Sequence, residues 1–200
     1  MQEAIQHLRA NDPVLSAIIE RVGAYGIQFR PPEFETLVKS IVYQQLSGRV
    51  ASVIFGRLSA AVKGVMTPDT ILRLRPSRMR TLGLSTQKTA YIRDLARHTR
   101  DGTVVFEELA ALPDDEVILR LTRVKGIGVW TAHMFLMFAL ERTDVLPTGD
   151  LGIRNAIRKA YNLAALPTPD EMERMAQSWR PYCTVASWYL WRSLEGDANL

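Results

Sequence analysis

The residue best suited to chemistry in this sequence is Asp150, in the segment VLPTGDLGIRNAIRKAY. The residues after it follow helical spacing, with Ile153, Ala156 and Ile157 on one face, so Asp150 stands at the start of an amphipathic helix. An aspartate in that place commonly caps the free amides of the helix. The same carboxylate can also supply negative charge to a reaction that builds up positive charge. The residues alone leave both roles open.

A second informative segment is LTRVKGIGVWTAHMFLMFAL, residues 121–140. Its pattern predicts a helix that ends at Lys125, a turn at Gly126-Ile127-Gly128 and a second helix that begins near Val129. The glycines allow positive φ and close backbone approach, and Ile127 can anchor the turn in the core. The first amides of the second helix would then form an anion site. A purely structural turn explains the same glycines.

Basic residues are concentrated in one stretch of the chain. Between residues 73 and 100, Asp94 is the only acid among eight basic residues: Arg73, Arg75, Arg78, Arg80, Lys88, Arg93, Arg97 and Arg100. The whole chain has a net charge of +4, which is compatible with a polyanionic partner but does not require one. A solvated basic face explains the stretch equally well.

The composition, 47% hydrophobic and 23% charged over 200 residues, is that of an ordinary globular protein. The richest apolar run, Val129 to Leu140, contains His133 and is shorter than the roughly 20 residues that a membrane helix needs. The N-terminus does not resemble a signal peptide, so we expect a cytoplasmic protein, associated with the nucleoid if it is bacterial. One cysteine, Cys183, and three histidines indicate no disulfide, no metal site and no cofactor.

The elements that must position these residues are predicted to be helices, about ten of them with short connections. Asp12-Pro13, Thr67-Pro68, Leu112-Pro113 and Thr168-Pro169 each open an amphipathic segment, and glycines follow several of these segments. Val104-Val105-Phe106 is the only strand-like run. The sequence therefore predicts an all-α protein.

The ordered motifs resemble a known family. VKGIGVWTA followed by PTGDLGIR is similar to the signature of helix-hairpin-helix (HhH-GPD) DNA glycosylases, and IVYQQLS, LGLSTQKTAYIRDLA and WRPYCTVASWYLW are similar to its AlkA-type 3-methyladenine glycosylase II branch. The resemblance spans about residues 30–195. It implies a single glycosylase unit over residues 1–200, with a helix-hairpin-helix lobe at about 35–145 and a second helical lobe formed by about 1–34 and 146–200. The family binds the damaged base in the cleft between its two lobes.

The resemblance implies that Asp150 is the catalytic residue and stabilises an oxocarbenium-like sugar while the base leaves. Trp130 stands where bifunctional relatives carry a Schiff-base lysine, so the resemblance implies a monofunctional enzyme without a lyase step. Lys125, Gly126, Ile127, Gly128 and Thr131 fall on the phosphate-binding hairpin of the family.

Gln45 matches the residue that relatives insert into DNA when a base flips out, and Leu46 is the neighbouring candidate. Leu46 could instead be a core residue that ends its helix. The base pocket is expected to contain Trp130, Trp191, Tyr43 and Met134, although both tryptophans could instead be core aromatics. Met134 replaces a tyrosine of some relatives and Cys183 an arginine, and both departures leave the preferred lesion open.

The expected function is therefore repair of double-stranded DNA by hydrolytic removal of alkylated bases such as 3-methyladenine, by a monomer that needs no membrane. The alternatives are a glycosylase for deaminated or oxidised bases and a non-catalytic DNA-binding protein that uses only the hairpin. The lack of iron–sulfur cysteines and of the hairpin lysine disfavours the endonuclease III-like branch.

Overall fold

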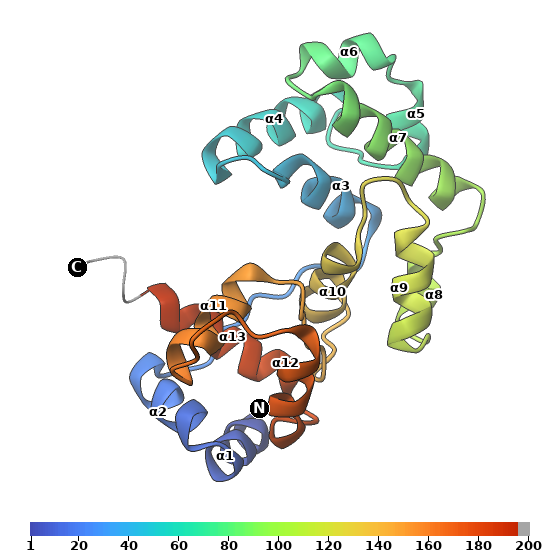
Figure 1. Cartoon of the computed structure of the whole chain (residues 1–200). Coiled ribbons are helices and arrows are strands. Elements are labelled where there is room, and N and C mark those ends of the chain that lie inside the picture. The colour runs from blue at the N-terminus through green and yellow to red at the C-terminus, as the bar shows by residue number, and fades with distance from the viewer. Residues whose placement is uncertain (196–200) are drawn as a thin grey trace. The chain divides into compact units, whose positions relative to one another are not determined.

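The computed structural model describes residues 1–195, and within that range all regular structure is helical (Figure 1). This confirms the predicted all-α class. By its internal packing the chain divides into two compact units. The first consists of Met1–Phe29 and the described residues from Leu136 onward, and the second of Arg30–Phe135.

The first unit is built around its last helix. Its elements are α1 (Gln2–Asn11), α2 (Pro13–Val22), α11 (Leu151–Ala160), α12 (Pro169–Met175), the short 3₁₀ helix η1 (Ala176–Ser178) and α13 (Cys183–Glu195). Helix α13 packs against α1, α2 and α11 (Figure 1). Trp179 and Tyr189 are the largest fully buried side chains of this core. Burial of such large apolar surfaces is the main source of stability for the unit.

Asp12 ties three elements of the first unit together. Its Oδ1 accepts from the amides of Val14 and Leu15 at 2.9 and 3.0 Å, which confirms the predicted helix start at Asp12-Pro13. Its Oδ2 accepts from the Tyr161 hydroxyl at 2.6 Å and from Trp179 Nε1 at 2.8 Å. Burial and the hydrogen bond to Asp12 raise the pKa of Tyr161. Both oxygens of Asp12 thus have structural roles.

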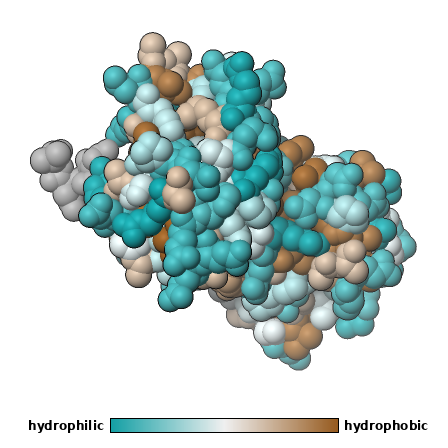
Figure 2. Space-filling model, turned by 90° about the horizontal axis from the view of Figure 1, so that it is seen from below, coloured by the Kyte–Doolittle hydropathy of each residue, from teal (hydrophilic) through white to brown (hydrophobic). Residues whose placement is uncertain are grey.

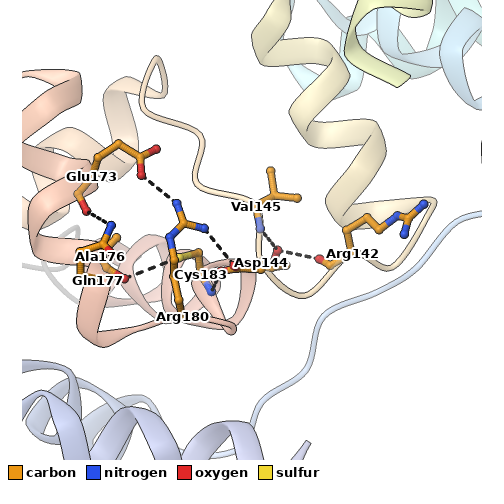
Figure 3. A network of polar contacts seen from close by, with 9 residues as sticks. Arg142, Asp144, Val145, Glu173, Ala176, Gln177, Arg180 and Cys183 are labelled. Carbon is orange, nitrogen blue, oxygen red and sulfur yellow. Dashed lines mark hydrogen bonds and ion pairs between the residues drawn. The ribbon is translucent and has the colours of Figure 1, made fainter. Parts of the chain in front are cut away.

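An ionic network holds the segment that leads to Asp150 (Figure 3). Arg180 donates from Nη1 to Asp144 Oδ2 at 2.9 Å and from Nη2 to Glu173 Oε2 at 2.7 Å. The amide of Cys183 donates to the other oxygen of Asp144 at 3.3 Å. The Cys183 side chain is fully buried, and burial raises the pKa of its thiol. Cys183 is therefore a core residue, and Arg180 supplies the guanidinium of this network.

The Thr184 hydroxyl fastens the same segment to α13. It donates to the Arg142 carbonyl at 2.7 Å and accepts from the Val145 amide at 3.1 Å. The backbone between α10 and α11 is therefore attached to the core a few residues before Asp150.

The second unit is built around α7. Its helices are α3 (Phe34–Tyr43), α4 (Gly48–Ala61), α5 (Pro68–Arg73), α6 (Pro76–Thr81), α7 (Thr86–Arg100), α8 (Phe106–Leu109), α9 (Asp114–Thr122) and most of α10 (Val129–Phe138). Helix α7 packs against α3, α5 and α6 and buries Ile92 and Leu95. Arg93 Nη1 donates to the carbonyls of Leu72 and Leu74, so this cation completes the C-terminal end of α5.

Two details of the sequence prediction are wrong. The described chain has thirteen α-helices rather than about ten, because elements such as α6 and α8 are too short to show a clear period. The helix before the glycine turn ends at Thr122 rather than at Lys125. The strand-like run at Val104 forms no strand, in agreement with the predicted all-α class, since Val104 donates to the His98 carbonyl and α8 begins at Phe106.

Candidate functional site

Asp150 caps helix α11, as its place in the sequence predicts. Its Oδ1 accepts from the Ile153 amide at 2.8 Å and from Trp191 Nε1 at 2.9 Å. The residue is 8% exposed, so the carboxylate is largely desolvated without being sealed from the surface. Two donors converge on one oxygen, and this fixes the orientation of the carboxylate. Capping does not exclude chemistry, because the same carboxylate that binds the cap amide can also stabilise a positive charge that develops beside it.

Trp191 reaches Asp150 from helix α13 of the same unit. Its indole stacks on Phe138, with ring centroids 5.9 Å apart and an angle of 24° between the planes. Gly152 leaves the necessary space, because a Cβ there would lie 3.0 Å from Asp150 Oδ1 and 3.2 Å from the indole. The sequence singled out Trp191 as a pocket wall but did not predict its hydrogen bond to Asp150. The glycine two residues after the aspartate was the available signal.

The predicted hairpin lies between α9 and α10. Gly126 has φ +84°, and a Cβ there would lie 2.1 Å from Cδ2 of the Tyr91 ring, so both its conformation and its surroundings require glycine. Ile127 is buried and anchors the turn, as predicted. The Lys125 amide donates to Asp94 Oδ2 at 2.9 Å. Asp94 thus takes an amide that a longer α9 would have used, which explains why the helix ends early.

The candidate phosphate-binding residues of the hairpin differ in exposure. Lys125 and Gly128 are exposed, whereas the side chains of Ile127 and Thr131 are buried. Because α10 begins at Val129, the amides of its first turn have no carbonyl partner within the helix. The hairpin can therefore offer an anion these amides and the Lys125 ammonium.

Three of the predicted pocket residues lie in the second unit. Trp130 is 45% exposed, which rules out the alternative that it is a core aromatic. Met134 follows it by one turn of α10 and is half-buried. Tyr43 is half-buried at the end of α3, with Lys39 Nζ 5.7 Å from its ring centroid. Trp130 and Met134 share one face of α10, because residues four apart on a helix are neighbours.

The wedge candidates lie in residues 44–47, which we call the wedge loop, between α3 and α4. Gln45 has φ +55°, in the left-handed region that favours glycine. Leu46 is 38% exposed and lies three residues after Tyr43, the last residue of α3. The alternative that Leu46 is a core residue ending its helix is therefore wrong, since its side chain is available at the surface.

Two residues that the sequence did not assign to the site hold the wedge loop. Gln44 Nε2 donates to the Gly126 carbonyl at 2.9 Å. Lys88 Nζ donates to the carbonyls of Val42 and Gln44 at 2.7 and 2.6 Å, and burial lowers the pKa of Lys88. The motif STQK contains this lysine but carries no signal of where its ammonium lies.

The basic stretch is only partly a surface feature. Lys88 and Arg93 are half-buried and bond to backbone carbonyls, whereas the other six basic residues of the stretch are exposed: Arg73, Arg75, Arg78, Arg80, Arg97 and Arg100.

On the face shown in Figure 2, hydrophilic residues lie between the hydrophobic ones. Exposed apolar residues such as Leu46 and Trp130 must therefore be interpreted one at a time.

Among the described residues, no group of three or more histidine, cysteine, aspartate or glutamate side chains could hold a metal ion. Over the same part of the chain, no helix has the length and apolar character needed to cross a membrane.

Known proteins are similar to this chain over most of its length. The model of the HhH-GPD superfamily of base excision DNA repair proteins matches residues 38–181. The DNA-3-methyladenine glycosylase 1 of Schizosaccharomyces pombe is 34% identical to 94% of this chain, over 85% of its own length.

Solved structures agree with this match. The crystal structure of a DNA-3-methyladenine glycosidase from Bacillus halodurans has a TM-score of 0.89 and 37% identity, and covers 98% of this chain and 90% of its own. A Schizosaccharomyces pombe 3-methyladenine DNA glycosylase in complex with abasic DNA has a TM-score of 0.82 and 35% identity, over 94% of this chain and 95% of its own.

Proposed function

Because the chain belongs to the HhH-GPD superfamily of base excision DNA repair proteins, we propose that it is a DNA-3-methyladenine glycosylase that removes alkylated bases from double-stranded DNA. The observation that carries the proposal is the Asp150 carboxylate, held by Ile153 and Trp191 at the start of α11. Relatives named for 3-methyladenine, two of them solved structures, support the substrate class.

The chemistry needs little more than one oriented negative charge. An N-alkylated purine is cationic, so it leaves as a neutral base that takes the electron pair of the glycosidic bond. Positive charge then builds up on the sugar, as in glycoside hydrolysis, and Asp150 stabilises it. Water adds to C1′ and loses a proton, which leaves free base and an abasic site.

Only the glycosidic bond is broken in this proposal. Trp130 occupies the second position of α10, where bifunctional relatives carry a lysine, and an indole cannot form a Schiff base with the sugar. Lys125 is exposed at the hairpin turn, where its ammonium suits a phosphate contact. We therefore propose a monofunctional enzyme.

The second unit supplies the grip on DNA. The hairpin offers the amides at the start of α10 and the Lys125 ammonium to a phosphate, and this contact positions the protein without reading sequence. Extruding a nucleotide costs a few kcal/mol and leaves a gap, and Gln45 or Leu46 from the exposed wedge loop fills it.

Selectivity for alkylated bases follows from aromatic surface. The exposed face of Trp130 favours a cationic base over a neutral one by about 0.5–2 kcal/mol. Met134 and Tyr43 are the other candidates for the base pocket in the second unit. Trp191 donates a hydrogen bond to Asp150, so in this proposal it supports the carboxylate as well as lining the pocket.

The test is base release from methylated duplex DNA, analysed by chromatography for free bases and by gel for strand breaks. We expect free 3-methyladenine, and strand breaks only after hot alkali. Breaks without alkali would overturn the monofunctional assignment. Release of hypoxanthine or 8-oxoguanine alone, from duplexes carrying those bases, would replace alkylated bases as the substrate. DNA binding without release from any duplex would leave a non-catalytic binding protein.

Mass analysis of the complex should find one protein per lesion, since we propose that the enzyme acts as a monomer.

A further inference from the structure

One side of α7 supports both DNA-contacting segments of the second unit. Lys88 donates to the carbonyl of Val42 and to that of Gln44, the first residue of the wedge loop. Tyr91, one turn later, packs its ring against Gly126. Asp94, a further turn along, accepts from the amide of the residue before Gly126. Residues three apart on a helix are neighbours, so these three contacts come from adjacent turns.

A direct bond closes the connection. Gln44 Nε2 donates to the Gly126 carbonyl at 2.9 Å, so the wedge loop and the hairpin turn are joined although their residues are far apart in sequence. The contacts between the wedge loop, the hairpin turn and α7 form a ring through Lys88, Gln44, Gly126 and Tyr91. Each of these contacts involves a side chain, and none is a backbone–backbone hydrogen bond. A few side chains therefore determine how the wedge loop lies relative to the hairpin turn.

The loop held in this way contains a strained residue. Gln45, the wedge candidate, has φ +55°, a region that costs a non-glycine residue free energy and persists only where its surroundings enforce it. Lys88 provides that enforcement, because its ammonium binds the carbonyl of Val42 in the last turn of α3 and the carbonyl of Gln44, the first residue of the wedge loop. An apolar side chain of similar length could fill the same space but could not bind those carbonyls.

We propose that Lys88 and Gln44 are positioning residues that hold the wedge loop in register with the hairpin turn, so that phosphate binding and nucleotide extrusion occur in one geometry. The proposal rests on the function proposed above, in which the wedge loop enters DNA. Neither residue contacts the reacting atoms in this proposal. Their loss should therefore reduce extrusion more than it reduces binding to undamaged DNA.

The test uses a duplex in which 2-aminopurine stands beside an abasic-site analogue, because its fluorescence rises when the wedge unstacks it. Lys88→Met and Gln44→Met remove the bonds but leave an unbranched side chain of similar length, and Lys88→Arg can restore donors to the carbonyls. Lys63→Met removes a charge from an exposed position of the same unit and is the matched control. Affinity for undamaged duplex is measured by anisotropy, and folding by thermal melting.

We expect the two Met variants to lower the extrusion equilibrium on the order of tenfold, with affinity for undamaged DNA changed less than about twofold. Lys88→Arg should recover most of the signal, and Lys63→Met should match the parent. If Lys88→Met does not fold, Gln44→Met decides the question alone. Parental fluorescence in a folded Met variant, equal losses of affinity and extrusion, or no signal from the parent would each overturn the proposal.

Base release by the same samples separates the two proposals. Release by the parent together with parental extrusion in the variants would leave the glycosylase function standing and refute the positioning role. If the parent releases no base but the variants show the expected pattern of fluorescence, the positioning role would stand and the glycosylase function would be refuted.

Discussion

Replacing Asp150 by asparagine should remove most of the catalysis and little of the fold. Asparagine is nearly as good a helix cap as aspartate, and its amide oxygen can accept from Ile153 and Trp191 as Oδ1 does now. The variant loses the interaction of the negative charge with the N-terminal end of α11, which is worth about 0.3–1 kcal/mol. For a protein of this size that lowers Tm by no more than about 4 °C.

The effect on the reaction is larger because the charge itself is needed. A carboxylate about 4 Å from the developing cation, at an effective dielectric near 20, stabilises it by about 4 kcal/mol. Since each 1.4 kcal/mol is a factor of ten, Asp150→Asn should release base about a thousandfold more slowly than the parent.

The assay is single-turnover release of 3-methyladenine with protein in excess, combined with DNA binding and thermal melting. Asp170→Asn, an exposed aspartate in the first turn of α12, is the matched control and should behave as the parent. A rate for Asp150→Asn within about tenfold of the parent would refute the electrostatic role. A variant that neither folds nor binds DNA would show that the loss is structural.

Three further predictions concern the contacts around the site. Gly126→Ala should weaken DNA binding and lower the unfolding free energy by more than about 1 kcal/mol, because its Cβ meets the Tyr91 ring at positive φ. Gly128→Ala, with no protein atom near its Cβ, should leave the unfolding free energy unchanged. Denaturation curves of both variants and a binding curve of Gly126→Ala check this, and equal stability of the two variants would contradict it. Trp191→Phe keeps the ring but loses the indole donor, so single-turnover release should slow by about ten- to a hundredfold at unchanged DNA affinity; a parental rate would show that the hydrogen bond does not matter. Burial raises the pKa of Cys183, so its thiol should react with a thiol reagent only when the protein unfolds. Above about pH 9 the unfolded chain loses this proton and the folded chain keeps it, so the unfolding free energy should fall as the pH rises. Fast labelling of the folded protein would refute this.

Much of the local structure was decided by the sequence alone. Asp12 caps its helix as predicted, and Thr67 and Thr168 form capping boxes, because a cap is made by residues two or three positions away. The same holds for Asp150, whose bond to Ile153 spans three residues. The all-α class and the family also followed from the sequence, since they depend on periodicity and on short motifs.

Errors arose where an element ends or a side chain is placed by a distant partner. The end of α9 depends on Asp94, 31 residues before the amide it accepts from, and no local pattern contains that bond. Leu46 fits the apolar pattern of a core residue, but α3 has already ended at Tyr43 and the side chain lies at the surface.

Only the tertiary structure decided how the candidate site is held together. Trp191 donates to a carboxylate 41 residues earlier, Lys88 to a carbonyl 44 residues earlier, and Gln44 to a carbonyl 82 residues later. Such bonds depend on how helices pack, and packing is a property of the whole core rather than of any segment. The sequence therefore determined which residues were candidates for the chemistry, and the packing of the helices determined which other side chains hold them in place.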